Sequence, residues 1–164
     1  MTDNTLSEAL KEAYASAPSN VILLHTLELR HPSFVDENGN PTAIRVVRDN
    51  LNHICTLEDT ASLDAGKAVE FIAMGFDLEL PPVEAIPVPE ITLTLDNVST
   101  EIIQYLDRAV ETQDMIEMTY RPYLSNDLSC PQMNPPITLV ITEITADISK
   151  ISATARMMDI GNKS

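Results

Sequence analysis

The stretch ITLTLDN, residues 91–97, decides the fold class of this chain. Its apolar residues Ile91, Leu93 and Leu95 are separated by threonines. Successive side chains of a strand point to opposite faces, so this alternation is typical of an antiparallel sheet with one buried face and one solvated face. The stretch therefore predicts a fold built mainly from β-strands.

Helical spacing replaces the alternation directly after this stretch. Ser99 or Thr100 can cap the start of a helix that runs to about residue 110. Its apolar residues recur at helical intervals: Ile102, Ile103, Leu106 and Val110. A shorter amphipathic helix is predicted at residues 5–16, so residues 1–20 are expected to form an N-terminal helix or arm.

Further stretches rich in β-forming residues lie on both sides of this unit. They predict strands at residues 21–31, 43–50, 53–57, 67–81, 114–123, 137–149 and 150–160. The turn sequence Asn38-Gly39 predicts that the first two strands form a hairpin, and the last two are expected to pair in the same way. Residues 67–81 are interpreted as one long strand in which Gly75 can mark a bulge.

Together these elements predict a single α+β domain over residues 1–164 that is mostly β. The expected architecture is an antiparallel β-sandwich or split barrel with a flanking helix and a short N-terminal helix. Residues 81–90 contain four prolines and are expected to form an extended strap along the domain or across a neighbouring subunit. The long loop 124–136 is expected to contact another subunit and to be poorly ordered in the isolated chain.

Composition narrows the range of functions. The 164 residues are 44% hydrophobic and carry 25 acidic against 10 basic side chains, a net charge of −15. Such a surface repels phosphate, so direct nucleic-acid binding and docking on an anionic membrane are not expected. No long apolar run predicts a membrane span, and the N-terminal residues do not resemble a secretory signal. The chain is therefore expected to begin in a cytoplasm.

A search for catalytic and ligand-binding motifs identifies no cofactor, metal or catalytic site. Only four glycines are present and none belongs to a phosphate-binding loop. Cys55 and Cys130 lie in no metal-binding cluster and are predicted to be free, buried thiols. Cys55 can be combined on paper with His25 or His31 into a nucleophile–base pair, but a cysteine inside a predicted strand is more often a small core residue.

Several stretches together resemble a known family. They are EALKEAYASAP (8–18), VILLHTLEL (21–29), RVVRDN (45–50), VEFIAMGFDLELPP (69–82) and EITLTLDNVSTEIIQYLDRAV (90–110). The chain resembles a family of uncharacterised tail proteins of long-tailed bacteriophages, similar to the N-terminal part of lambda-type minor tail proteins of the tip. The resemblance implies a tail-tip or tail-completion subunit with a tail-tube-like fold. The resemblance implies no catalytic residue, and it implies no iron–sulfur site because this chain has no cysteine cluster.

The leading hypothesis is a structural subunit, present in the virion and assembled in the host cytoplasm, that forms a ring at the distal tail end. Its partners are expected to be further copies of itself and other phage tail proteins. The expected interface residues are apolar side chains of the strap and the long loop: Val83, Ile86, Val88, Leu124, Leu128 and Met133. The alternatives are a small cysteine hydrolase or peptidase-like accessory protein that uses Cys55, and a cytosolic binding module for a basic partner.

Overall fold

The computed structural model describes residues 21–79 and 90–157. The predicted N-terminal helix within residues 1–20 lies outside these ranges. So do residues 81–89 of the proline-rich segment, which include the expected interface residues Val83, Ile86 and Val88. Within the described ranges no helix is long and apolar enough to cross a membrane.

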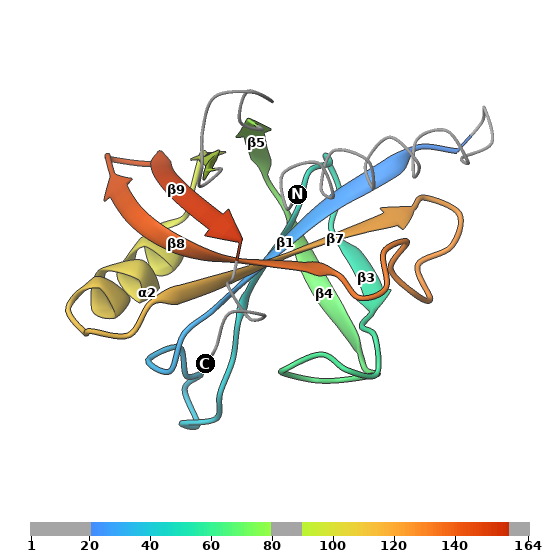
Figure 1. Ribbon diagram of the computed structural model, residues 1–164, viewed down its shortest axis with the longest axis horizontal. Coiled ribbons are helices and arrows are strands. Elements are labelled where there is room, and N and C mark those ends of the chain that lie inside the picture. The colour runs from blue at the N-terminus through green and yellow to red at the C-terminus, as the bar shows by residue number, and fades with distance from the viewer. Residues whose placement is uncertain (1–20, 80–89, 158–164) are drawn as a thin grey trace.

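The described residues form nine strands and one helix, which confirms the mostly β, α+β prediction (Figure 1). The elements are β1 (Leu23–Arg30), β2 (Ile44–Val47), β3 (His53–Thr56), β4 (Ala68–Ala73), β5 (Gly75–Glu79), β6 (Glu90–Asp96), α2 (Thr100–Val110), β7 (Ile116–Leu124), β8 (Ile137–Ala146) and β9 (Ile151–Met157).

All nine strands belong to one sheet with the order β3-β4-β2-β1-β7-β8-β9-β6-β5. Neighbouring strands run antiparallel, except that β2 and β4 are parallel. The two predicted hairpins, β1–β2 and β8–β9, are both present. In the first, Gly39 adopts a φ of +82° at the turn, a left-handed conformation that glycine reaches without steric cost.

Residues 67–81 do not form the single strand that their composition predicts. The chain makes two strands, β4 and β5, separated at Met74. β4 pairs with β2, whereas β5 pairs with β6 at the far end of the strand order. Because one residue connects strands near opposite ends of the sheet, the sheet must curl round on itself, which is the split-barrel form of the prediction (Figure 1).

The larger core fills the concave side of this curled sheet. Ile91, Leu93 and Leu95 are each at most 3% exposed, as their alternation predicts. Helix α2 packs into the same core through Leu106 and Ala109. Its N-cap is Ser99, whose hydroxyl accepts a hydrogen bond from the backbone N–H of Ile102, as predicted.

A smaller apolar cluster lies where the β3–β4 hairpin meets β1, β2 and β7. Its buried members are Leu24, Val47, Cys55, Leu57, Phe71 and Tyr123. Cys55 is fully buried, as predicted. Cys130 is exposed, which corrects the prediction that both thiols are buried; it lies in the turn-rich loop after β7, where its neighbours do not cover it.

Part of the loop after β7 packs on its own domain. The backbone N–H of Gln132 donates to the carbonyl of Pro122 over 2.7 Å, which folds the loop back along the strand. Met133, one of the expected interface residues, is 7% exposed and packs almost entirely in the larger core of its own domain. Leu128 packs against the smaller cluster, and Leu124 ends β7 half-buried.

Candidate functional site

Charged side chains occupy the face of β1 and β7 that the larger core leaves uncovered. In β1, Glu28 and Arg30 share a face, and in β7 they lie opposite Thr119 and Glu117. Arg121 stands two residues further along β7 on the same face. Strand alternation therefore places a row of ionisable groups across the middle of the sheet.

Glu28 lies at the centre of this row and is fully buried. Its carboxylate accepts hydrogen bonds from Arg30 Nη1 at 2.6 Å, Arg45 Nε at 2.8 Å and Arg121 Nη1 at 3.0 Å. Burial alone would raise the pKa of Glu28, but the three guanidinium groups outweigh it and hold the pKa below its ordinary value. Glu28 is thus ionised and fully coordinated by cations.

Arg121 connects Glu28 to a loop. Its side chain is 1% exposed, and Nε and Nη2 bind the two carboxylate oxygens of Glu58 at 2.8 and 3.0 Å, in the bidentate geometry that arginine favours. Burial would lower the pKa of Arg121, but the hydrogen bonds and charges of Glu58 and Glu28 raise it. The pair therefore fixes the segment after β3 onto the sheet.

The loop that carries Glu58 depends on glycine. Gly66 has a φ of +73°, and an added Cβ would lie 3.2 Å from a carboxylate oxygen of Asp59. Its backbone N–H donates to the carbonyl of Glu58 over 3.1 Å and so closes the loop. Asp64 in the same loop binds Arg45 at 3.0 Å. The tight loop thus brings two carboxylates to the charged row.

The outer end of the row is partly open to solvent. Glu117 binds Arg30 Nη2 at 3.0 Å while remaining 42% exposed. The charged network comprises Glu28, Arg30, Arg45, Glu58, Asp64, Glu117 and Arg121, and Lys67 lies 4.0 Å from Asp64 at its edge. Four carboxylates thus meet three guanidinium groups and one ammonium group. Within the described residues, every buried side-chain nitrogen and oxygen has a hydrogen-bond partner.

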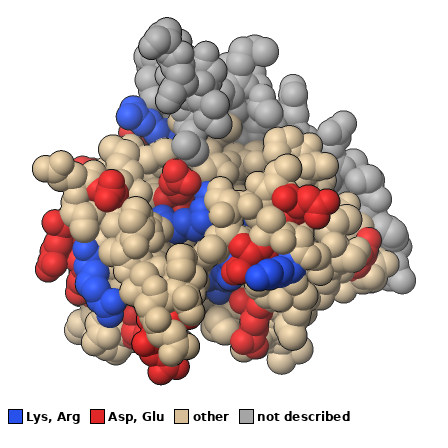
Figure 2. Space-filling view, turned by 90° about the horizontal axis from the view of Figure 1, so that it is seen from below, with Lys and Arg blue, Asp and Glu red and all other residues tan. Residues whose placement is uncertain are grey.

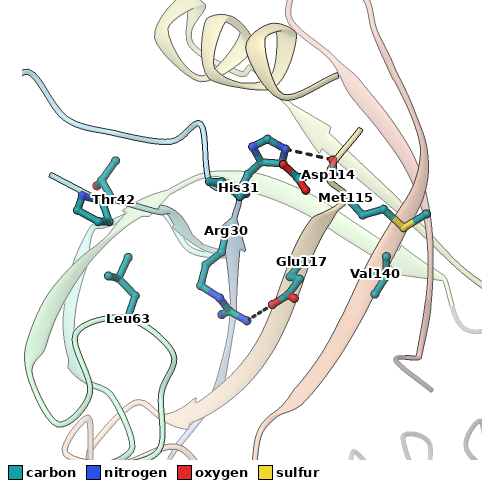
Figure 3. A pocket seen from close by; sticks show the side chains of 10 residues that line it. Arg30, His31, Thr42, Leu63, Asp114, Met115, Glu117 and Val140 are labelled. Carbon is teal, nitrogen blue, oxygen red and sulfur yellow. Dashed lines mark hydrogen bonds and ion pairs between the residues drawn. The ribbon is translucent and has the colours of Figure 1, made fainter. Parts of the chain in front are cut away.

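A surface pocket of about 470 Å³ opens beside this end of the network (Figure 3). Its lining residues come from the end of β1, the β1–β2 connection, the Glu58 loop, the start of β7 and β8: Arg30, His31, Pro32, Pro41, Thr42, Leu63, Asp114, Met115, Glu117 and Val140. His31 is held in place by Ser33 and by Thr112 and the carbonyl of Asp114.

The structure does not bring the residues of the hypothetical cysteine site together. The His25 ring contacts the hydroxyl of Tyr120, and His31 makes the contacts given above. His53 binds Asp49 at 2.6 Å. Cys55 is enclosed in the smaller cluster, where burial raises its thiol pKa to about 11. Among the described residues, no group of three or more His, Cys, Asp or Glu side chains is arranged to hold a metal ion.

These environments predict very different reactivities for the two thiols. A disulfide reagent at pH 8 should label Cys130 rapidly and Cys55 only after denaturant is added, because burial blocks access and a pKa of about 11 leaves little thiolate. The measurement is the number of rapidly released reagent equivalents, with Cys130→Ser as the control that should abolish the rapid phase. Two rapid equivalents would show a reactive Cys55 and favour the hydrolase alternative.

With this geometry in place, the chain can be compared with known proteins. A family model described as "Domain of unknown function (DUF1833)" matches residues 9–164. The chain belongs to this family. The DUF1833 match includes every strand and the helix described above, and therefore both the charged network and the pocket. No curated protein matches the chain.

Proposed function

We propose that this DUF1833 protein is a structural subunit of the distal end of a bacteriophage tail, where copies form a ring with other tail proteins. The observation that carries the proposal is the end of the sheet at β3–β4. There a strand edge that is uncovered around Ile54 coincides with exposed apolar side chains, a combination typical of surfaces that another chain covers.

The strand edge is defined by the pairing. Within the described residues, β3 pairs only with β4 and β5 pairs only with β6, so each ends the sheet. The β3 edge is already covered at Thr56, whose N–H donates to the carbonyl of Leu128 and whose carbonyl accepts from the Tyr123 hydroxyl. The backbone donor and acceptor that a strand of a neighbouring subunit can use therefore lie around Ile54. The two ends are different strands, so a contact between the β3 end of one copy and the β5 end of the next is heterologous, and heterologous contacts close into rings when the rotation permits.

The apolar surface consists of Leu51, Ile54 and Ile72, which are 68%, 62% and 41% exposed. Ile54 lies in β3 and Ile72 in β4, on the side of the hairpin that faces away from Cys55 and Phe71. We refer to these three residues as the β3–β4 patch. Burial of such side chains by a neighbour releases about 25 cal/mol per Å² of apolar area.

The charged network supports a structural role for the ionisable residues. Its buried members neutralise one another and connect β1, β2, β7 and the Glu58 loop, so their contacts maintain the shape of the subunit. The curled sheet with a flanking helix also agrees with the tail-tube-like architecture that the family resemblance implies. Val83, Ile86 and Val88 of the proline-rich segment remain part of the proposed interface.

The proposal is tested by disrupting the gene in the phage that encodes it. We expect infectious titre to fall by several orders of magnitude and electron micrographs to show tails that are absent or lack their distal structure. Expression of the intact chain from a plasmid should restore both. Normal titre and normal tails after disruption would refute the proposed function.

A further inference from the structure

The pocket beside Arg30 has two walls of different chemistry. Leu63 and Thr42 stand on one side, and Met115 and Val140 stand on the other, with Glu117 between them (Figure 3). Met115 is 55% exposed, so an unbranched thioether side chain borders the opening. These walls can pack against a flexible aliphatic chain.

The polar side chains of the pocket offer hydrogen-bond acceptors that are not in use and few donors that are not in use. Arg30 donates to Glu28, Thr119 and one oxygen of Glu117, which leaves the second oxygen of Glu117 without a partner among the described residues. The carboxylate of Asp114 likewise accepts no hydrogen bond from the described residues, because the contacts of this residue run through its backbone.

The balance of charge around the pocket is negative. The four carboxylates of the charged network are matched by three guanidinium groups and by Lys67, and Asp114 adds a carboxylate at the pocket that pairs with no cation of the described residues. The arginines of the network are committed to carboxylates on the protein side. An incoming anion would have to displace Glu117 from Arg30, whereas an incoming cation finds two carboxylates with free acceptor sites.

We propose that this pocket binds the side chain of an arginine or lysine that a partner protein presents. The aliphatic stem would lie against Leu63, Met115 and Val140, and the charged end would bind Asp114 and Glu117, the arrangement that long basic side chains adopt at mixed surfaces. A basic partner is favoured over a second copy because each copy carries a net charge of −15. Figure 2 shows acidic side chains spread over one face of the molecule, several of them next to Lys or Arg.

Peptide titration of the isotopically labelled full chain tests this proposal. The probes are two capped pentapeptides, Gly-Ser-Arg-Ser-Gly and its counterpart with uncharged citrulline in place of arginine. We expect the arginine peptide to shift the backbone amide signals of Thr42, Met115 and Val140, and the citrulline peptide to bind at least about 10-fold more weakly, since one charge-assisted hydrogen bond contributes about 1.5–3 kcal/mol.

Variants identify the site. The double change Asp114→Asn with Glu117→Gln should lower the affinity for the arginine peptide by about 10-fold or more. The charge-matched control changes Asp107→Asn and Glu143→Gln, two exposed acidic residues that do not line the pocket, and should bind like the unaltered chain. A thermal melt of each variant establishes that it is folded. Arg30 keeps its contact with Glu28 in the first variant, so the fold should persist.

Three outcomes would overturn the proposal. The first is that the citrulline peptide binds as tightly as the arginine peptide. The second is that the amide shifts are scattered over the acidic surface and both double variants lose the same affinity, and the third is that a Gly-Ser-Glu-Ser-Gly peptide shifts the same amide signals. The site belongs to the free chain, and it is proposed whether or not the chain is a tail subunit. A failed titration would therefore leave the gene-disruption result unaffected.

Discussion

Replacement of Arg121 with leucine is expected to lower the free energy of unfolding by about 3–5 kcal/mol, the cost of breaking a buried ion pair by removing one partner. Arg121 is 1% exposed and binds both Glu28 and Glu58, so the variant buries Glu28 with less compensation and releases the Glu58 loop from the sheet. Urea denaturation followed by circular dichroism measures the difference.

Arg156→Leu is the matched control. Arg156 lies in β9 with an exposed side chain, so its replacement should change the free energy of unfolding by no more than about 0.5 kcal/mol. A similar small loss in Arg121→Leu would mean that the network is hydrated in solution and does not fix the Glu58 loop.

The loss of stability in Arg121→Leu should depend on pH, because Arg121 binds the titratable carboxyl group of Glu28. The folded-state pKa of Glu28 lies below its ordinary value of 4.5, because the arginines outweigh burial. Ionised Glu28 therefore stabilises the folded chain fully above pH 4.5, and this contribution is lost as the pH falls through the lowered pKa. The difference in the free energy of unfolding between the unaltered chain and Arg121→Leu should therefore become smaller as the pH falls through the lowered pKa of Glu28.

The second large effect concerns assembly. A variant with Leu51→Glu and Ile54→Lys places two charges in the β3–β4 patch and leaves the net charge unchanged. Ile54 lies opposite Glu70 in the β3–β4 pair, so the new lysine can form an ion pair across the strands and the monomer should remain folded. Burying these charges against an apolar partner would cost roughly 3 kcal/mol or more, and incorporation into tails should fall at least about 100-fold.

Ile148→Lys is the control for this variant. Ile148 is 91% exposed in the β8–β9 connection, away from the β3–β4 hairpin, and its replacement should leave tail incorporation unchanged. The readout is the amount of each variant in purified particles when it complements the disrupted gene. Normal incorporation of the Leu51/Ile54 variant would exclude the β3–β4 patch from the interface.

Local patterns in the sequence predict much of this fold because they reflect local physics. The alternation at Ile91, Leu93 and Leu95 correctly predicts their burial, and Ser99 correctly predicts the start of α2. The division of residues 67–81 at Met74 could not be predicted in this way. Both halves have strand periodicity, and only the change of pairing partner from β2 to β6 separates them.

The charged network was missed because its members are far apart in the sequence. Glu28 and Arg121 are separated by 93 residues, and no local spacing relates them. One feature of the sequence could nevertheless have indicated the network. Glu28 and Arg121 each lie inside a stretch of otherwise strand-forming residues, where a charged side chain must either face solvent or meet an opposite charge. Two such residues of opposite sign in predicted central strands could have suggested the pair.

Composition was also a poor guide to the loop after β7. Its prolines and asparagines correctly predict the absence of a long strand, but they carry no information about which apolar side chain turns inward. Met133 joins the larger core from this loop, while Cys130 three residues earlier remains exposed. These outcomes depend on how the loop folds back on Pro122, a contact that the sequence alone does not reveal.

The most direct test of the proposed role is to locate the protein in purified phage particles. Quantitative mass spectrometry of purified tails would be combined with immunogold labelling of an epitope tag, placed on a chain shown to complement the disrupted gene. The tail-subunit proposal predicts several copies of the protein per tail, with gold particles at the distal end. Infectious particles that contain none of the protein, although infected cells produce it, would contradict the proposal.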